Sequence, residues 1–421
     1  MRQFLMTTWD GAGVTPPMMS VARALVERGH RVRVLADPVL AAEVAAVGAE
    51  HRPWTRAPHR TERTPETHFV EDYHADLAGG FARMRDRLAV GPVASFAADV
   101  REELERQPAD VILSEVLLFG PLVAAEALGV PVVVLNSTIN MIPAPGVPPF
   151  GMGLMPATDE AGRRRDDELA AAITAAWDEA LPALNAARAE QGLQPLEHVL
   201  DQARVAARVL VMTSRAFDFM GPLPPTVKHV GPRLVDPDWA GDWSPPAGEG
   251  PLVLVSLSCD FQDQENVLRR IVEAMGQLPV RALLTTGHGI DPSTITAPAN
   301  VTVVRAAPHT EVLGEAQLVI THCGHGTTIK ALAAGVPLVC LPMGRDQLDV
   351  AARVVHAGAG VRLDMIADPR EIAAATRTVL ADGSYRDAAC RVASVIRDET
   401  ASDLALAEIE AVVKERAALA V

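Results

Sequence analysis

The chain has 421 residues, of which 49% are hydrophobic and 4% aromatic, and its formal net charge at pH 7 is −15. This length exceeds what one compact core usually holds, so it predicts two α/β domains. The negative charge argues against a nucleic acid as a partner. The four cysteines form no C-x-x-C pair, so the sequence predicts neither a zinc site nor a disulfide framework.

The N-terminal residues predict a β-α-β unit. A short apolar run at 4–8 favours a strand, Pro16 and Pro17 open a helix that Gly29 ends, and residues 31–36 form the next strand. The first apolar run is too short for a signal peptide. Because the chain also lacks the run of roughly 18 apolar residues that a membrane span needs, we expect a cytoplasmic protein that is a monomer or a homodimer.

The middle of the first half alternates strands and helices around two irregular segments. Residues 56–76 are polar and predict a loop or a mobile segment. Residues 141–157 are rich in Pro, Gly and Met and predict a loop that faces a substrate. Regular elements are expected at 77–107 (helical), 110–114 (strand), 118–128 (helix), 131–135 (strand), 159–190 (helical) and 209–213, the strand that closes the first sheet.

A segment rich in proline and glycine divides the chain at 216–250, where no helical or strand period is visible. We therefore predict a first domain at 1–215, a linker at 216–250 and a second domain at 251–398, both domains being Rossmann-like. Strands of the second domain are expected near 252, 281–285, 301–304, 317–321 and 337–341. Residues 399–421 predict a C-terminal helix.

The most informative stretch runs from 319 to 347 and begins V-I-T-H-C-G-H-G-T-T. A strand there ends in a glycine-rich turn (Gly324, Gly326) and opens a helix, which presents free backbone N–H groups and the positive end of the helix dipole. That geometry suits phosphate. The side chains of His322, Thr327 and Thr328 can donate further hydrogen bonds to it, whereas His325 is either another contact or a spacer in the turn.

A sugar-binding pair is expected shortly after this turn. Asp346 and Gln347 follow the next apolar strand, and a carboxylate beside a carboxamide suits the hydroxyls of a sugar. Asp346 can alternatively be an exposed helix N-cap. Phosphate and sugar recognition about twenty residues apart in one βαβ unit predicts a nucleotide-sugar site.

Three further residues lie at strand ends of the second domain and have two interpretations each. Ser258 contacts the diphosphate or caps the following helix. Thr286 has the same ambiguity at the end of the next strand. His309 lines a base pocket or is a plain surface residue.

The segments T-H-C-G-H-G-T-T and P-M-G-R-D-Q resemble the donor signature of glycosyltransferase family 1, more narrowly the actinobacterial antibiotic glycosyltransferases. The resemblance extends over essentially the whole chain and is looser from 55 to 205. It implies a GT-B α/β fold, with two facing Rossmann-like domains and an interdomain cleft. The first domain would bind the acceptor and the second the nucleotide-sugar, and the final helix would pack back on the first domain.

The resemblance also assigns roles to the donor-site residues. His322 would bind the β-phosphate and Thr327 with Thr328 the α-phosphate, and Ser258, Gly324, His325 and Gly326 would complete the diphosphate site. Asp346 and Gln347 would bind the sugar. The nucleobase of the donor would contact Ala307, His309 and Thr286. The aromatic residue that relatives often carry before the proline of A-P-H-T is Ala306 here.

The catalytic base departs from the family pattern. Many relatives carry a His in the N-terminal loop, held by an acid at the end of a later strand. Here those positions are Gly13 and Glu115. Asp10 is the first candidate for the base and Glu115 the second, although Asp10 can simply stabilise its turn and Glu115 can cap a helix. His68, Asp72 and His74 lie in the polar segment that can fold over the acceptor. For the acceptor we expect contacts from Gly13, His68, Met141 and Phe150.

The sequence therefore predicts an inverting glycosyltransferase. It would move a sugar from a UDP- or dTDP-sugar to a small apolar natural product, such as a polyketide-like aglycone, by single displacement. We expect no metal and no cofactor beyond the nucleotide-sugar co-substrate. Two other interpretations stay open: a non-hydrolysing nucleotide-sugar epimerase, and a catalytically inactive auxiliary protein of the same fold.

Overall fold

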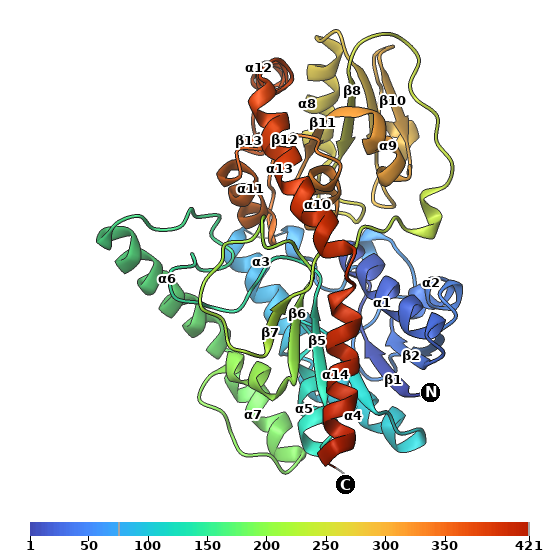
Figure 1. Ribbon diagram of the computed structural model, residues 1–421, viewed down its shortest axis with the longest axis vertical. Coiled ribbons are helices and arrows are strands. Elements are labelled where there is room, and N and C mark those ends of the chain that lie inside the picture. Colours follow the sequence, from blue (N-terminus) through green and yellow to red (C-terminus); the bar gives the residue numbers. More distant parts are fainter. Residues whose placement is uncertain (75, 420–421) are drawn as a thin grey trace.

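The computed structural model describes residues 1–74 and 76–419. Figure 1 shows two α/β lobes stacked along the long axis of the molecule, the N-terminal one below and the C-terminal one above. Each lobe is built on its own parallel sheet. The prediction of two Rossmann-like domains is confirmed.

The first sheet has seven parallel strands in the order β3-β2-β1-β4-β5-β6-β7. Apolar runs buried on both faces, as in β4 and β5, are typical of a parallel sheet covered by helices. The strands are β1 (Gln3–Thr7), β2 (Arg31–Ala36), β3 (Glu50–Pro53), β4 (Val111–Glu115), β5 (Val132–Asn136), β6 (Arg208–Val211) and β7 (Val227–His229).

The second sheet has six parallel strands in the order β10-β9-β8-β11-β12-β13. The order 3-2-1-4-5-6 within each sheet is that of dinucleotide-binding folds, in which ligands bind beyond the carboxyl ends of the strands. The strands are β8 (Leu252–Ser256), β9 (Arg281–Thr285), β10 (Val301–Val304), β11 (Ala316–Thr321), β12 (Leu338–Cys340) and β13 (Gly360–Arg362).

Helices connect the strands, because parallel neighbours require crossovers. Sequence signals mark several ends: Pro16 and Pro17 lie in the first turn of α1, and Asp368 with Glu371 forms a capping box on α12. The helices are α1 (Thr15–Glu27), α2 (Ala41–Ala46), α3 (Leu77–Met84), α4 (Val93–Arg106), α5 (Phe119–Leu128), α6 (Glu160–Asp178), α7 (Leu181–Glu190), α8 (Glu265–Gly276), α9 (His309–Glu315), α10 (His325–Ala333), α11 (Gln347–His356), α12 (Pro369–Ala381), α13 (Gly383–Thr400) and α14 (Leu404–Leu419).

The predicted linker at 216–250 contains a strand that the sequence did not indicate. β7 pairs in parallel with β6, so residues 209–213 do not close the first sheet. The strand is three residues long and follows a proline-rich run, which is too short for an alternating pattern to be visible. The structured part of the first lobe therefore extends beyond the predicted boundary at 215.

The C-terminal helix α14 lies along the first lobe, as the red helix in Figure 1 shows. Its side chains Leu406, Ile409 and Val412 belong to the apolar core beside the first sheet. Arg208 of β6 pairs with Glu408 at 2.8 Å and with Glu415 at 2.6 Å. Residue 399, the predicted start of this helix, lies instead in the last turn of α13.

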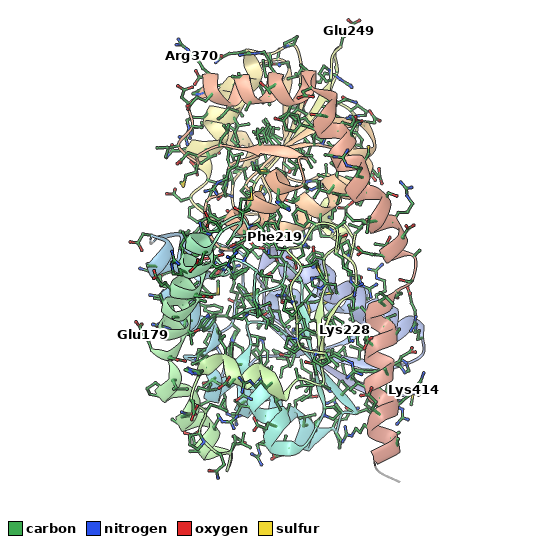
Figure 2. All side chains as sticks on the ribbon, turned by 60° about the vertical axis from the view of Figure 1, so that its left-hand side comes forward. Glu179, Phe219, Lys228, Glu249, Arg370 and Lys414 are labelled. Atoms are coloured by element: carbon green, nitrogen blue, oxygen red, sulfur yellow. The ribbon has the colours of Figure 1, made fainter. Side chains whose placement is uncertain are left out.

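Polar contacts hold the two lobes together. Asp72 of the polar segment accepts two hydrogen bonds from Arg345 at 2.6 and 2.8 Å. Arg353 of α11 bonds Asp218 at 2.8 Å and lies 4.2 Å from the ring centroid of Phe219, which Figure 2 shows at the junction of the lobes. The segment that we expected to be a mobile loop is therefore docked on the second domain.

Candidate active site

A cavity of about 2550 Å³ lies between the lobes. Residues at the carboxyl ends of strands from both sheets line it, including Glu115, Ser256, Thr285 and His322. This is where open α/β sheets bind ligands.

The turn between β11 and α10 forms one wall of the cavity. His322 follows β11, and its Nδ1 lies 3.3 Å from Thr321 Oγ1. A Cβ on Gly324 would lie 2.7 Å from His322 Nε2, so only glycine allows the imidazole to pack over the turn. Burial lowers the pKa of His322 to about 3, which favours the neutral ring.

The first turn of α10 leaves room for a ligand. A Cβ on Gly326 would meet nothing within 4 Å, and Gly326 and Thr327 both line the cavity. Thr328 does not: its side chain is fully buried and is not part of the cavity wall. Its hydroxyl is buried without a hydrogen-bond partner among the described atoms, so the predicted phosphate contact by Thr328 stays a prediction.

His325, predicted as either a diphosphate contact or a spacer in the turn, lines the cavity and also contacts the first domain. Its Nε2 lies 2.8 Å from Thr213 Oγ1 of the first domain, and the ring makes a second hydrogen bond to the backbone of Ser137. Burial lowers its pKa to about 4. With both first-domain partners in place, the imidazole ties the lobes together.

Asp346 and Gln347 both line the cavity at the start of α11. Asp346 holds the N-cap position but makes no capping hydrogen bond. It accepts a bond from Thr138 Oγ1 at 2.5 Å instead, and burial raises its pKa. Gln347 accepts from the backbone N–H groups of Met343 and Gly344 at 2.8 and 3.1 Å, which orders the loop beneath.

The predicted base-binding residues are only partly placed at the cavity. Ala307 and His309 line it, and His309 Nε2 lies 3.3 Å from Thr285 Oγ1. Thr286 is buried and not part of the wall, so this prediction is wrong by one residue, because successive side chains point in opposite directions at the end of β9. Ser258 lines the cavity and accepts from Asp260 N–H at 3.3 Å.

The two candidate bases lie in contrasting environments. Asp10 accepts from Arg63 Nε at 3.1 and 3.2 Å and lies 3.3 Å from Arg60 Nη1. Guanidinium groups therefore contact both oxygens of this carboxylate. The structure therefore argues against Asp10 as the base.

Glu115 ends β4 on the cavity wall, with 1% of its surface exposed. Burial raises its pKa to about 7, although the N–H of Leu117 donates to Oε2 at 2.9 Å. A Cβ on Gly13 would meet nothing within 4 Å. The position at which relatives carry a His is therefore open space in the same cavity.

The first-domain side of the cavity is rich in apolar side chains. Gly13, Met141 and Phe150, which were predicted to contact an acceptor, line the cavity. His68 does not: it is buried, and its Nε2 lies 3.2 Å from Asp260 of the second domain. The prediction for His68 is therefore wrong, and the side chain of His74 lies outside the described residues. The sequence interpretation missed an aromatic group formed by Phe81, Phe119 and Trp177, with ring centroids 5.0 and 5.8 Å from Trp177.

Within residues 1–74 and 76–419, no helix has the length and apolar character that a bilayer span requires. In the same ranges, no group of three or more His, Cys, Asp or Glu side chains is arranged to hold a metal ion.

Comparisons with known proteins agree with this arrangement. Residues 195–419 match the family model described as UDP-glucoronosyl and UDP-glucosyl transferase. The chain is 32% identical to 4'-demethylrebeccamycin synthase of Lentzea aerocolonigenes, covering 94% of this chain and 95% of that protein. It is 26% identical to NDP-glycosyltransferase YjiC of Bacillus subtilis (strain 168), with 96% of each covered. Among solved structures, CalG4, the calicheamicin glycosyltransferase, superimposes with a TM-score of 0.76 at 23% identity over 98% of both chains.

Proposed function

The chain belongs to the UDP-glucoronosyl and UDP-glucosyl transferase family and is therefore a glycosyltransferase of GT-B fold; on that premise we propose that it transfers a sugar, with inversion, from a UDP- or dTDP-sugar to an apolar natural product. One observation carries the proposal. A glycine-rich helix start beside a buried imidazole lies in the same cavity as a carboxyl group with a pKa of about 7 and an aromatic wall.

The donor diphosphate is proposed to bind at the start of α10. Its negative charge suits the free N–H groups and the dipole of the first turn, with Thr327 and His322 as side-chain donors. An anion beside His322 Nε2 favours the form of the ring that carries a proton on that nitrogen. Asp346 and Gln347 then face the sugar. These donors stabilise the charge that develops on the leaving diphosphate.

Glu115 is proposed as the catalytic base. As the acceptor oxygen attacks the anomeric carbon, its proton passes to the Glu115 carboxylate, and the bond between that carbon and the diphosphate oxygen breaks. A base with a pKa near the working pH is the most effective kind. The open space at Gly13 allows the acceptor to approach on this side.

The acceptor class is inferred from the lining of the first-domain half of the cavity. Met141, Phe150, Phe81 and Trp177 offer a broad apolar surface, which suits a flat or macrocyclic aglycone. The names of the relatives, a 4'-demethylrebeccamycin synthase and a calicheamicin glycosyltransferase, support a natural-product acceptor.

A transfer screen tests the proposal. The chain is incubated with UDP- and dTDP-sugars and a panel of aromatic and polyketide aglycones, and products are detected by mass spectrometry. We expect a mass increase of one sugar residue and, by NMR, an anomeric configuration opposite to that of the donor. Conversion of the donor sugar without an acceptor would indicate an epimerase, and nucleotide binding without any turnover would indicate an inactive relative; either result would overturn the proposal.

A further inference from the structure

The connecting segment, residues 216–250 between the two lobes, is held against the part of the cavity where the donor is proposed to bind. Asp236 accepts from the Thr310 N–H at 2.9 Å and from the Thr310 hydroxyl, in the first turn of α9. Its other oxygen lies 2.6 Å from Lys330 Nζ of α10. These contacts fix the connecting segment to the first turn of α9 and to the last turn of α10.

Trp239 follows three residues later and lines the cavity. Its ring centroid is 4.5 Å from that of His288, in the loop after β9. The same loop is tied to the end of β10, because Gly287 N–H donates to Arg305 O at 2.9 Å. The indole therefore lies beside the carboxyl ends of β9 and β10, next to the residues expected to hold the nucleobase.

Trp239 is the large aromatic ring that the described residues place in this part of the cavity. Among the described residues of the connecting segment and the second domain that line it, Trp239 is the only Phe, Tyr or Trp. Positions 306 and 307 are alanines and offer no aromatic face. His288 Nε2 is buried there without a hydrogen-bond partner among the described atoms, which leaves a polar group for a ligand to satisfy.

We infer that Trp239 is the stacking platform for the nucleobase of the donor and that it takes the place of an aromatic side chain at position 306. This inference rests on the proposed function, since it assumes that a nucleoside diphosphate occupies the cavity. A base offers a flat face whose stacking on an indole contributes substantially to affinity. The connecting segment is then part of the donor site as well as a covalent link between the lobes.

Titration calorimetry with UDP, dTDP and inorganic pyrophosphate tests the inference on the full chain. Trp239→Ala should raise the Kd for UDP and dTDP by about tenfold (~1.4 kcal/mol). It should leave the Kd for pyrophosphate within roughly twofold, because pyrophosphate has no base. Trp239→Phe keeps an aromatic face and should retain most of the affinity.

Trp243→Ala is the matched control, since Trp243 is in the same segment, packs on the second-domain core and does not line the cavity. Its Kd for UDP should equal that of the unchanged chain. A tryptophan that only supports the fold would give equal losses for UDP and pyrophosphate in Trp239→Ala, and that result would overturn the inference, as would an unchanged Kd for UDP.

His322→Ala separates this inference from the proposed function. If His322→Ala weakens UDP and pyrophosphate alike while Trp239→Ala changes neither, the donor site stands and the stacking role fails. If the unchanged chain binds none of the three ligands, the proposed function fails together with the stacking role.

Discussion

Two carboxyl groups near the carboxyl ends of the neighbouring strands β1 and β4 show how its surroundings decide whether such a group can act as a base. Asp10 and Glu115 both line the cavity. Asp10 is held by Arg60 and Arg63, whereas burial raises the pKa of Glu115 to about 7. The oxygens of the first group are occupied by guanidinium contacts, whereas the second group can take up a proton near neutral pH.

Glu115→Gln should lower kcat by roughly 10²–10⁴-fold while leaving the Kd for UDP unchanged. The amide fills the same space and cannot accept a proton. Steady-state kinetics and calorimetry on the same preparation check the two quantities. Asp10→Asn is the comparison, and a larger loss of kcat in that variant would reverse the assignment of the base.

The pH dependence of kcat/KM should report the same carboxyl. The base acts only when ionised, so activity should fall about tenfold per pH unit below about 7 and level off above it. The stability of the fold should depend on pH in the opposite direction to activity. Because the pKa of Glu115 is raised from 4.5 to about 7, its contribution to the free energy of unfolding is fully present below pH 4.5 and is lost as the pH rises through about 7. Glu115→Gln should therefore be at least as stable as the unchanged chain at pH 8, and a clear loss would contradict this account.

Gly326→Ala should distinguish an effect on the stability of α10 from an effect on the room available to a ligand. Alanine favours the helix by up to about 1 kcal/mol, but its Cβ would enter the open part of the cavity. We expect a slightly raised Tm together with a Kd for UDP about tenfold higher, since overpacking costs ~1–3 kcal/mol. Gly314→Ala in α9 is the control, because that position is open and outside the cavity. Equal affinities in both variants would place the diphosphate elsewhere.

At the scale of elements, α10 and α14 depend on different parts of the chain. α10 begins where β11 and its glycine-rich turn place it, so local sequence suffices to define it. α14 is a helix of the C-terminus whose apolar side chains are buried only because the chain returns to the first lobe. Its contribution to stability is therefore a property of the assembled molecule.

Ile409→Ala tests that contribution. Ile409 is fully buried against the first sheet, so its truncation should lower the free energy of unfolding by about 2–5 kcal/mol. Chemical denaturation followed by circular dichroism measures the change. Lys414→Ala is the control on the same helix, since Lys414 is exposed, as Figure 2 shows, and should change stability by less than about 0.5 kcal/mol. Equal effects would mean that α14 is not anchored at this position.

At the scale of the whole molecule, the relative position of the lobes depends on buried polar pairs. Burial alone would raise the pKa of Asp72, but the Arg345 guanidinium holds it below its ordinary value. Arg345 has a left-handed backbone with φ of 55° and lies next to Asp346. The contact between the lobes and the position of Asp346, the predicted sugar contact, are therefore linked through one arginine.

Asp72→Asn should loosen this contact between the lobes. Removing one partner of a buried pair costs roughly 3–5 kcal/mol when both groups stay buried, so the lobes should separate to rehydrate Arg345. We expect faster proteolysis within 56–74 and a larger radius of gyration by solution scattering. Glu66→Gln removes one charge from an exposed position of the same segment and should change neither measurement. An unchanged proteolysis rate in Asp72→Asn would show that this pair does not hold the cleft closed.

The amino-acid sequence alone determined the features that depend on near neighbours. The two parallel sheets follow from the periodicity of the sequence. The cavity position of His322, Gly324, Gly326, Thr327, Asp346 and Gln347 follows from turn chemistry and motif spacing, because those residues lie within one βαβ unit. The meaning of Gly13 came from the family resemblance alone.

Tertiary structure decided what depends on distant partners. His325 and His68 contact the opposite lobe, and Thr328 and Thr286 are buried. The environments of Asp10 and Glu115, the strand β7 and the position of Trp239 likewise come from segments far apart in the chain. Burial and charge pairing are set by those long-range contacts, and they decide which of several similar polar side chains is free to meet a ligand.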